Sequence, residues 1–388
     1  MKLRKHCVVC LSPAFNSHKT ITQFPIFMGA VETQLKDDIY ADQKWASCSN
    51  CGCVQLLELV PNEILYQNSH NHFPTGPTWA LHNETFVDFI SSHIDNSENV
   101  LEVGAAHGYI AEKLGYLYPQ MKYTIVEPSP GKFPEKVHLV KGYIEDNLDL
   151  INDAHCLIHS HVLEHIYEPR LFFAQTSYRM REGSRLIFSV PNLPKAIELR
   201  GANALNFEHT YMLDESVVEY FAKIHNMNIL AKHYFKDHSI FFALEKRGAS
   251  SAVTLPNLTY WSIEFYQFWE EIKEFALSVA QRQQFEVISP CYIFGAHIFS
   301  QVLLWGGVHE NGIVGVLDNS PSKQEKRLYG TNLSIFPPNV ILKDFKPHVI
   351  VLGGYYQSEI ERQLREINPT VQIITIKSTH NNAEQNIT

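Results

Sequence analysis

Two short segments carry the side chains best suited to moving protons. His161 and His165 follow the apolar run 154–159, and Glu208 directly precedes His209. Imidazole titrates near neutral pH and is therefore a common general base, and a neighbouring carboxylate can orient its ring. The pattern indicates acid–base chemistry. The alternatives are an ordinary loop pair for Glu208 and His209, and a helix start beside a cofactor for His165.

A turn of small residues offers a place for a nucleotide-like ligand. Segment 101–108 follows a β-prone run and precedes a helical pattern, so its backbone can approach a ligand closely. The small residues of this turn are Gly104, Ala105, Ala106 and Gly108. The next predicted strand ends in Glu127, about 20 residues on, where a carboxylate can accept ribose hydroxyls. The alternative is a packed turn that binds no ligand.

Four further residues are expected to border the same ligand. Glu102 precedes the turn, Pro128 follows Glu127, and Ser160 and His161 follow the strand predicted at 154–159. The turn, the acidic strand end and segment 159–165 together resemble the class I S-adenosylmethionine methyltransferases more than a dehydrogenase. The resemblance implies S-adenosylmethionine (SAM) as the cofactor.

Four of the seven cysteines form two pairs with metal-ligand spacing. Cys7 and Cys10 make one Cys-x-x-Cys knuckle, and Cys48 and Cys51 make the other. Four thiolates in this arrangement suit a closed, structural zinc site. A redox pair or an empty site is the alternative, and the remaining cysteines are expected to be buried.

Length and charge limit the class of protein. A chain of 388 residues is long enough for two to three domains, each with its own core. The net charge is −9 and no long basic run occurs, so we expect no nucleic-acid partner. Polar residues and glycines interrupt the longest apolar stretch, 287–308, and no signal peptide is evident. We therefore expect a cytoplasmic protein with no membrane contact.

The central part of the chain alternates strand and helix patterns. Strands are predicted at 99–103, 123–127, 154–159, 185–190, 229–234 and 239–244, and helices at 110–118, 171–180 and 211–225. This alternation predicts a doubly wound α/β sheet whose ligands bind beyond the carboxyl ends of the strands. A further helix is predicted at 80–94, before the first of these strands.

Candidate substrate contacts lie in the loops around this sheet. His72 and His82 flank a loop rich in proline and glycine, Asn192 follows the strand predicted at 185–190, and Tyr211 begins the helix predicted at 211–225. Each could instead be a polar residue of a packed loop. A metal bound by the loop histidines is not expected, because no carboxylate recurs at ligand spacing.

Motifs along the whole chain resemble the sugar C-methyltransferase family. They are the paired knuckles, Pro61-x-Glu63-x-Leu65-Tyr66, Glu102-Val-Gly104, Glu208-His-Thr-Tyr211, Tyr292-Ile-Phe-Gly-Ala296 and Leu317-Asp-Asn-Ser-Pro-Ser-Lys323. The resemblance implies a zinc-binding domain at 1–75, a SAM-dependent methyltransferase core at 76–248 and a Rossmann-like domain at 249–388. It also implies a nucleotide-linked 4-keto-6-deoxy sugar as substrate, methylated at C-3′ beside the ketone.

The resemblance assigns roles to individual residues. His209 becomes the base that removes the proton beside the ketone, and Glu208 orients the ring or contacts the sugar. His165, His72 or Tyr211 would donate a hydrogen bond to the developing oxyanion. The chain departs from the family at Asn206 and Phe207, where tyrosine and histidine are frequent, and at His70 and His72, where tyrosines are frequent. The nucleotide, the sugar and the methylated position therefore stay open.

Other functions share parts of this pattern. A sugar O-methyltransferase would use the same cofactor turn and a histidine base. An RNA-modifying methyltransferase would explain a zinc module beside such a core, and a non-catalytic scaffold would keep only the fold. In the C-terminal part, Gly295 lacks the second and third glycines of a dinucleotide fingerprint, so NAD is not expected. We expect a monomer or a homodimer.

Overall fold

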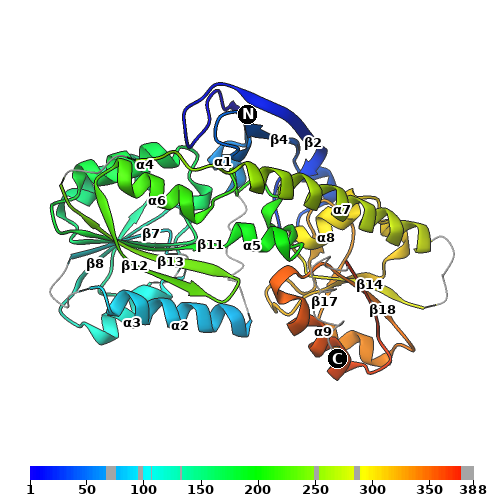
Figure 1. Cartoon of the computed structure of the whole chain (residues 1–388). Helices are drawn as coiled ribbons and strands as arrows, with labels where there is room; N and C mark the ends of the chain where they lie inside the picture. Colours follow the sequence, from blue (N-terminus) through cyan, green and yellow to red (C-terminus); the bar gives the residue numbers. More distant parts are fainter. Residues whose placement is uncertain are drawn as a thin grey trace, which may run out of the picture.

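The N-terminal part of the chain is built from short antiparallel strands. The computed structural model describes residues 1–66, 76–94, 99–105, 107–131, 133–248, 253–283 and 289–376 (Figure 1). A three-stranded sheet has the order β2 (Phe15–Pro25), β4 (Tyr40–Cys48), β5 (Val54–Leu56), and β1 (Lys2–Leu3) pairs with β6 (Glu58–Leu59). The hairpin formed by β2 and β4 brings the two cysteine pairs together, since β4 ends at Cys48. The short helix α1 (Asn62–Leu65) follows.

A seven-stranded sheet forms the centre of the molecule. Its order is β12 (Met227–Phe235), β13 (Ser239–Lys246), β11 (Arg185–Pro191), β10 (Cys156–Ser160), β7 (Asn99–Val103), β8 (Lys122–Glu127), β9 (His138–Lys141). Neighbouring strands from β11 to β9 are parallel, whereas β13 is antiparallel to both of its neighbours. This mostly parallel α/β sheet has the class I methyltransferase fold. The doubly wound sheet predicted from the sequence is thus confirmed.

Helices cover both faces of this sheet (Figure 1). On one face lie α2 (Pro77–Ser91) and α3 (Tyr109–Leu117), and on the other α4 (Pro169–Arg179) and α6 (Glu215–Ile224). The short α5 (Leu193–Glu198) follows β11. Each helix presents buried apolar residues to the sheet, as its sequence periodicity requires.

The start of the helix predicted at 211–225 was wrong. The helix α6 begins only at Glu215, because the side chain of Asp214 accepts a hydrogen bond from the Ser216 backbone at 2.8 Å and caps it. Tyr211 instead forms an isolated β-bridge with Gln55 of β5. Segment 210–212 therefore contacts the N-terminal part of the chain.

The C-terminal part contains a second, smaller sheet. Its parallel strands have the order β17 (Ile335–Phe336), β15 (Gly315–Leu317), β14 (Cys291–Phe294), β18 (His348–Val351), β19 (Gln372–Thr375). The long helix α7 (Thr259–Gln283) precedes this sheet in the sequence. Helix α8 (Ile298–Trp305) connects β14 to β15, and α9 (Gln357–Ile367) connects β18 to β19. The turn at Gly295 lies between β14 and α8.

The N-terminal part is tied to the C-terminal part as well as to the central sheet. Strand β3 (Ala30–Val31) pairs antiparallel with β16 (Arg327–Leu328). Arg327 donates to both carboxylate oxygens of Asp38 at 2.6 and 2.7 Å, and the Asp38 side chain is fully buried. A bidentate pair of this kind fixes geometry as well as adding energy. One apolar core cluster accordingly contains residues of all three parts.

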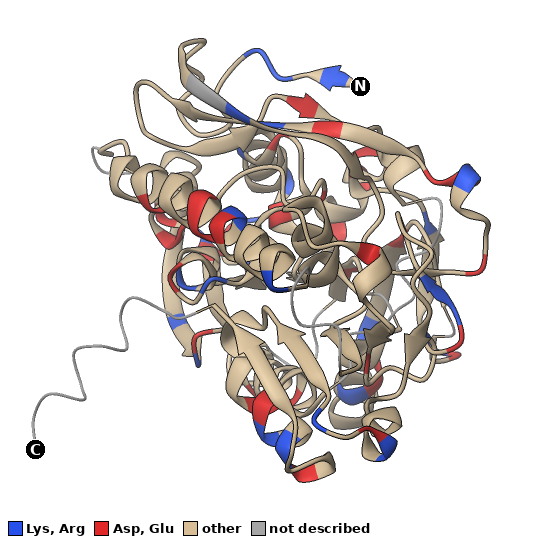
Figure 2. Cartoon of the chain, turned by 90° about the vertical axis from the view of Figure 1, so that its right-hand side faces the viewer, with Lys and Arg blue, Asp and Glu red and all other residues tan. Residues whose placement is uncertain are grey.

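Charged side chains of both signs are interspersed on the side of the molecule that Figure 2 shows. The sequence of the long helix α7 includes the acidic residues Glu270, Glu271 and Glu274. Within the described ranges, every helix is either too short or too polar to cross a membrane.

Candidate active site

A cavity of about 400 Å³ opens beyond the carboxyl ends of β7, β8 and β10. Gly104 directly follows β7 with φ +71°, and a Cβ atom there would lie 2.6 Å from Val162 Cγ2. Gly108 precedes α3 with φ +73°, and its Cβ would lie 2.5 Å from the Phe133 ring. Both positions require glycine, for conformation and for space. The backbone is thereby held close to whatever fills the cavity.

Most of the residues predicted to bind the cofactor line this cavity. They are Glu102, Gly104, Ala105, Glu127, Pro128, Ser160 and His161. Gly108 supports the turn from outside the lining, and Ala106 lies outside the described residues. The structure therefore brings both sides of the predicted nucleotide-like site, the small-residue turn and the acidic strand end, to one cavity.

The two carboxylates of the cofactor side differ in their surroundings. Glu127 Oε1 accepts a hydrogen bond from the Ser129 backbone at 2.9 Å, which holds the carboxylate at the end of β8. Glu102 is buried within β7 and accepts a hydrogen bond from the Tyr123 hydroxyl at 2.7 Å. Burial raises the pKa of Glu102 to about 7, although the Tyr123 hydroxyl favours the charged form. Glu127 is thus the better placed acceptor for ribose hydroxyls.

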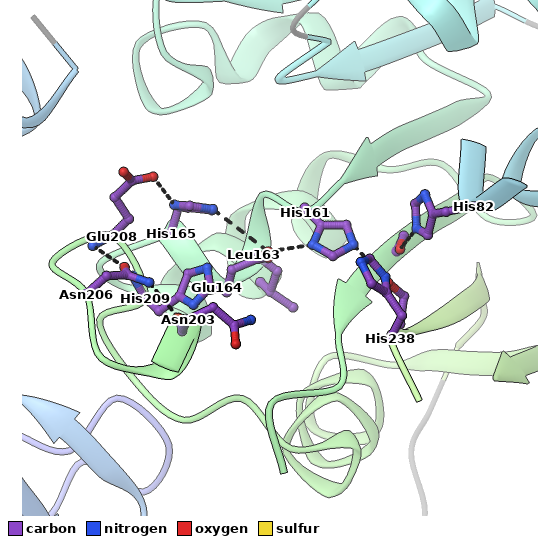
Figure 3. A network of polar contacts seen from close by, with 12 residues as sticks. His82, His161, Leu163, Glu164, His165, Asn203, Asn206, Glu208, His209 and His238 are labelled. Carbon is purple, nitrogen blue, oxygen red and sulfur yellow. Dashed lines mark hydrogen bonds and ion pairs between the residues drawn. The ribbon is translucent and has the colours of Figure 1, made fainter. Parts of the chain in front are cut away.

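Two of the predicted acid–base residues also line this cavity. His165 and Glu208 both line it, and His165 Nδ1 lies 3.5 Å from Glu208 Oε2 (Figure 3). The hydroxyl of Tyr66 lies 3.2 Å from the same nitrogen. His165 thus sits between a carboxylate and a phenol, in direct contact with the cavity.

His209 lies next to this lining and not within it. Its ring makes an edge contact with the His165 ring, with centroids 5.2 Å apart. The backbone carbonyl of Asn203 hydrogen-bonds the ring, and because a carbonyl only accepts, the ring nitrogen facing it carries the hydrogen. The other nitrogen, Nδ1, is buried and has no hydrogen-bond partner among the described residues. Its lone pair is therefore available to take a proton.

The loop that carries His209 is organised by Asn206. The side-chain oxygen of Asn206 accepts hydrogen bonds from the backbone of Glu208 at 2.8 Å and of His209 at 2.7 Å. Its amide donates to the Asn203 carbonyl at 2.6 Å, and Phe207 is buried. The two departures from the sugar C-methyltransferase pattern thus shape the loop and pack it.

Glu164 is a member of the site that the sequence analysis did not single out. It is fully buried in the short helical turn Leu163–His165, and it offers a carboxylate oxygen within 4.8 Å of ring nitrogens of His165 and His209. Burial raises the pKa of Glu164 to about 7, opposed by His209. Burial likewise lowers the pKa of His209, opposed by Glu164. A carboxylate between two histidines in segment 161–165 was the available signal.

The predicted substrate contacts have mixed outcomes. His72 lies outside the described residues, and His82, Asn192 and Tyr211 do not line the cavity. The Asn192 side chain caps α5 by accepting from the Lys195 backbone at 3.3 Å. The buried Tyr211 hydroxyl donates to the Leu163 carbonyl at 3.0 Å and so supports the turn that carries Glu164 and His165. The described geometry gives Asn192 and Tyr211 structural roles, and their contacts to substrate stay predictions.

Several cavity residues were not predicted as site residues, because single aromatic and amide side chains carry no spacing signal; of these, only Tyr66 belongs to a motif quoted above. Tyr66, Trp79, Asn83 and Tyr143 all line the cavity. Met28 of the N-terminal part and His297 beyond β14 also reach it. The cavity is therefore bordered by all three parts of the chain.

The four predicted metal-ligand cysteines converge at one point. Their sulfur atoms all lie within 4.8 Å of one another, with Cys7 and Cys51 3.6 Å apart and Cys10 and Cys48 3.4 Å apart. A tetrahedral zinc ion with Zn–S bonds of about 2.3 Å places its sulfur ligands roughly 3.8 Å apart. The arrangement of the thiols thus fits a tetrahedral ion.

Comparison with known proteins agrees with this fold. Residues 80–239 match the family described as methyltransferase domain, in agreement with the α/β fold of the central sheet. A search of curated proteins gave no match.

Similar solved structures include three methyltransferases. The plantazolicin methyltransferase BpumL, in complex with a triazolic desmethylPZN analogue and SAH, is 13% identical over 48% of this chain and 92% of its own, with a TM-score of 0.38. Human N-acetylserotonin methyltransferase in complex with SAM is 11% identical over 48% and 56%, with a TM-score of 0.37. The N-methyltransferase NodS from Bradyrhizobium japonicum WM9 is 13% identical over 45% and 98%, with a TM-score of 0.32.

Proposed function

We propose that the protein transfers a methyl group from SAM to a ring carbon, C-3′, of a nucleotide-linked 4-keto-6-deoxy sugar. One observation carries the proposal: the cofactor turn, His165 and Glu208 line one cavity, and the His209 ring packs against His165 with an Nδ1 that has no hydrogen-bond partner among the described residues. The resemblance of the chain's motifs to the sugar C-methyltransferases supplies the substrate class.

The proposed chemistry needs a base and a stabilised oxyanion. A hydrogen on carbon beside a ketone becomes acidic when a base removes it while the enolate oxygen receives a hydrogen bond. SAM, when bound, supplies an electrophilic methyl group on a positively charged sulfur. The turn at Gly104 and the carboxylate of Glu127 would hold it, since both border the cavity.

His209, Glu208 and His165 have separate roles in this proposed reaction. By the resemblance, the His209 imidazole takes the C-3′ proton, and the electron pair of the C–H bond passes into the enolate. The new carbon–methyl bond forms as the sulfur–methyl bond breaks, leaving S-adenosylhomocysteine, and the proton leaves His209 for solvent. Glu208 and His165 lie on the cavity wall, where His165 can donate to the enolate oxygen.

We also propose that Zn²⁺ occupies the four-cysteine site in a structural role. Four thiolates close the coordination sphere and leave no position for substrate. The ion would join the loop carrying Cys7 and Cys10 to the end of β4, which carries Cys48.

The test is product analysis with a panel of nucleotide 4-keto-6-deoxy sugars and SAM labelled in its methyl carbon. The proposal predicts a mass gain of one methyl group and an NMR correlation of the label to C-3′, with no correlation through oxygen. Label attached to oxygen would replace C-methylation by O-methylation. Absence of transfer to every member of the panel would refute the substrate class.

A further inference from the structure

Three histidines outside the acid–base residues converge beside the same cavity. His82 lies in α2, His161 follows β10, and His238 lies between β12 and β13. One nitrogen from each ring lies within 4.8 Å of the other two (Figure 3). We call these residues the three-histidine cluster. Segments far apart in sequence thus bring three potential metal ligands to one point.

Each ring of the three-histidine cluster has an oxygen atom close to its outer nitrogen. His82 Nδ1 is hydrogen-bonded to Asn83 Oδ1 at 3.1 Å, and His238 Nε2 is hydrogen-bonded to the Tyr356 hydroxyl at 2.9 Å. His161 Nδ1 lies 3.2 Å from Glu164 Oε1, a contact at ion-pair distance without hydrogen-bond geometry. Metal-binding histidines typically use their second nitrogen in this way, with a carboxylate, a carbonyl or another oxygen.

The inner nitrogens face a pair of serine hydroxyls. His82 Nε2 lies 3.0 Å from Ser189 Oγ, whereas His161 Nε2 and His238 Nδ1 lie 3.0 and 2.6 Å from the same Ser239 Oγ. A hydroxyl has one hydrogen to donate, so Ser239 cannot donate to both imidazoles. The two hydroxyls therefore satisfy the three inner nitrogens only in part. A cation would bind the nitrogen lone pairs that receive no hydrogen bond.

The cluster is enclosed and held under local strain. His82 and His238 are buried, and the Trp79 ring packs edge-on against all three imidazoles at 4.6 to 5.1 Å. His161 has φ +54°, a left-handed conformation that costs a residue other than glycine roughly 1–3 kcal/mol. Strained conformations of this kind concentrate at functional sites.

We propose that the three-histidine cluster binds a divalent transition-metal ion, Zn²⁺ by ligand type, separately from the four-cysteine site. Three imidazoles suit Zn²⁺ and its neighbours in the first transition row, whereas Mg²⁺ and Ca²⁺ prefer oxygen ligands. Three histidines and one oxygen form a familiar zinc set, and Ser239 Oγ or a water molecule can supply the oxygen. This inference does not depend on the proposed methyl transfer.

The position of the ion would give it a clear structural consequence. His161 lines the cavity, so the ion would lie at the cavity wall and join α2 to the β12–β13 turn. His238 also contacts Tyr356, just before α9, through its outer nitrogen. Binding would therefore fix the central sheet against the C-terminal part.

The test is the number and type of metal ions in the full-length protein. After incubation with excess ZnCl₂ and gel filtration, elemental analysis should give two zinc ions per wild-type chain and one per His238→Asn chain. The matched control is His233→Asn, an exposed histidine on β12 outside the cluster, which should keep two. Equal zinc content in the wild-type and His238→Asn chains would overturn the proposal, whatever the occupancy of the four-cysteine site.

A second measurement covers the case in which His238→Asn does not fold. X-ray absorption of the zinc-loaded wild-type protein should show nitrogen or oxygen and sulfur ligands in about equal number, because one site has four sulfurs and the other has none. A shell of sulfur alone would contradict the three-histidine site. Cobalt substitution gives the same distinction, since imidazole-bound Co²⁺ lacks the thiolate charge-transfer band.

Discussion

Replacing His209 with glutamine tests the proposed base. The variant retains an amide that can donate to the Asn203 carbonyl, and it removes the unpartnered Nδ1 lone pair. No hydrogen bond of Nδ1 is lost among the described residues, so we expect a change in the free energy of unfolding of less than about 1 kcal/mol. The effect should therefore fall on catalysis and not on folding.

The expected loss of rate follows from the role of a base. A positioned general base contributes roughly 10²- to 10⁴-fold, equivalent to about 3 to 5 kcal/mol of activation free energy. His209 lies apart from the cofactor turn, so the affinity for SAM should change less than about threefold. We thus expect a large fall in kcat with near-constant SAM binding.

The pH profile of the wild-type enzyme gives a second signature. Burial lowers the pKa of His209 below its usual 6.5, and a base acts in its neutral form. The acid limb of kcat/KM should therefore have its midpoint below pH 6.5, and the rate should fall as the pH decreases through it.

The assay is single-turnover methyl transfer, with SAM binding measured by calorimetry. His165→Gln is the informative comparison, because His165 lines the cavity and His209 does not. A loss confined to His165→Gln, with His209→Gln within tenfold of wild type, would refute the assignment of the base and move it to His165.

Three further perturbations have defined outcomes. Burial raises the pKa of Glu102 to about 7, so native Glu102 keeps a proton that the unfolded chain releases above about pH 4.5, and the wild-type free energy of unfolding should fall between pH 4.5 and 7. In urea unfolding, the free energy of unfolding of Glu102→Gln relative to wild type should be up to about 3 kcal/mol higher at pH 8 than at pH 4, whereas a pH-independent difference would contradict the assignment. Gly104→Ala places a Cβ 2.6 Å from Val162 and should weaken SAM binding at least tenfold by calorimetry, whereas Gly183→Ala, also at positive φ but with open space around it, should not. Cys10→Ser should lower the zinc content by one ion per chain and reduce the melting temperature, with Cys291→Ser as control, and unchanged zinc content would argue against the four-cysteine site.

Regular elements were predictable where local pattern determines them. The strands around Val103 and Glu127 are apolar β-prone runs, and their order in sequence is enough to place the cofactor turn at the carboxyl edge of the sheet. The start of α6 was missed because the cap at Asp214 overrides the apolar pattern that begins at Tyr211.

The composition of the site was harder to predict than its place. Glu164 owes its role to burial between two histidines, which depends on tertiary packing. The three-histidine cluster draws on residues more than seventy positions apart, and no spacing rule connects them. Asn192 was predicted to contact substrate because it follows a strand. In the structure its side chain caps the N-terminus of α5.

The central claim is most directly tested by hydrogen exchange at the sugar carbon. A nucleotide 4-keto-6-deoxy sugar is incubated in D₂O with the enzyme, with SAM left out or replaced by S-adenosylhomocysteine, and the C-3′ proton is followed by NMR. The wild-type enzyme should replace that proton with deuterium, and His209→Gln should not. Retention of the C-3′ proton in the presence of an enzyme that still methylates the sugar, or equal exchange by the variant, would contradict the claim.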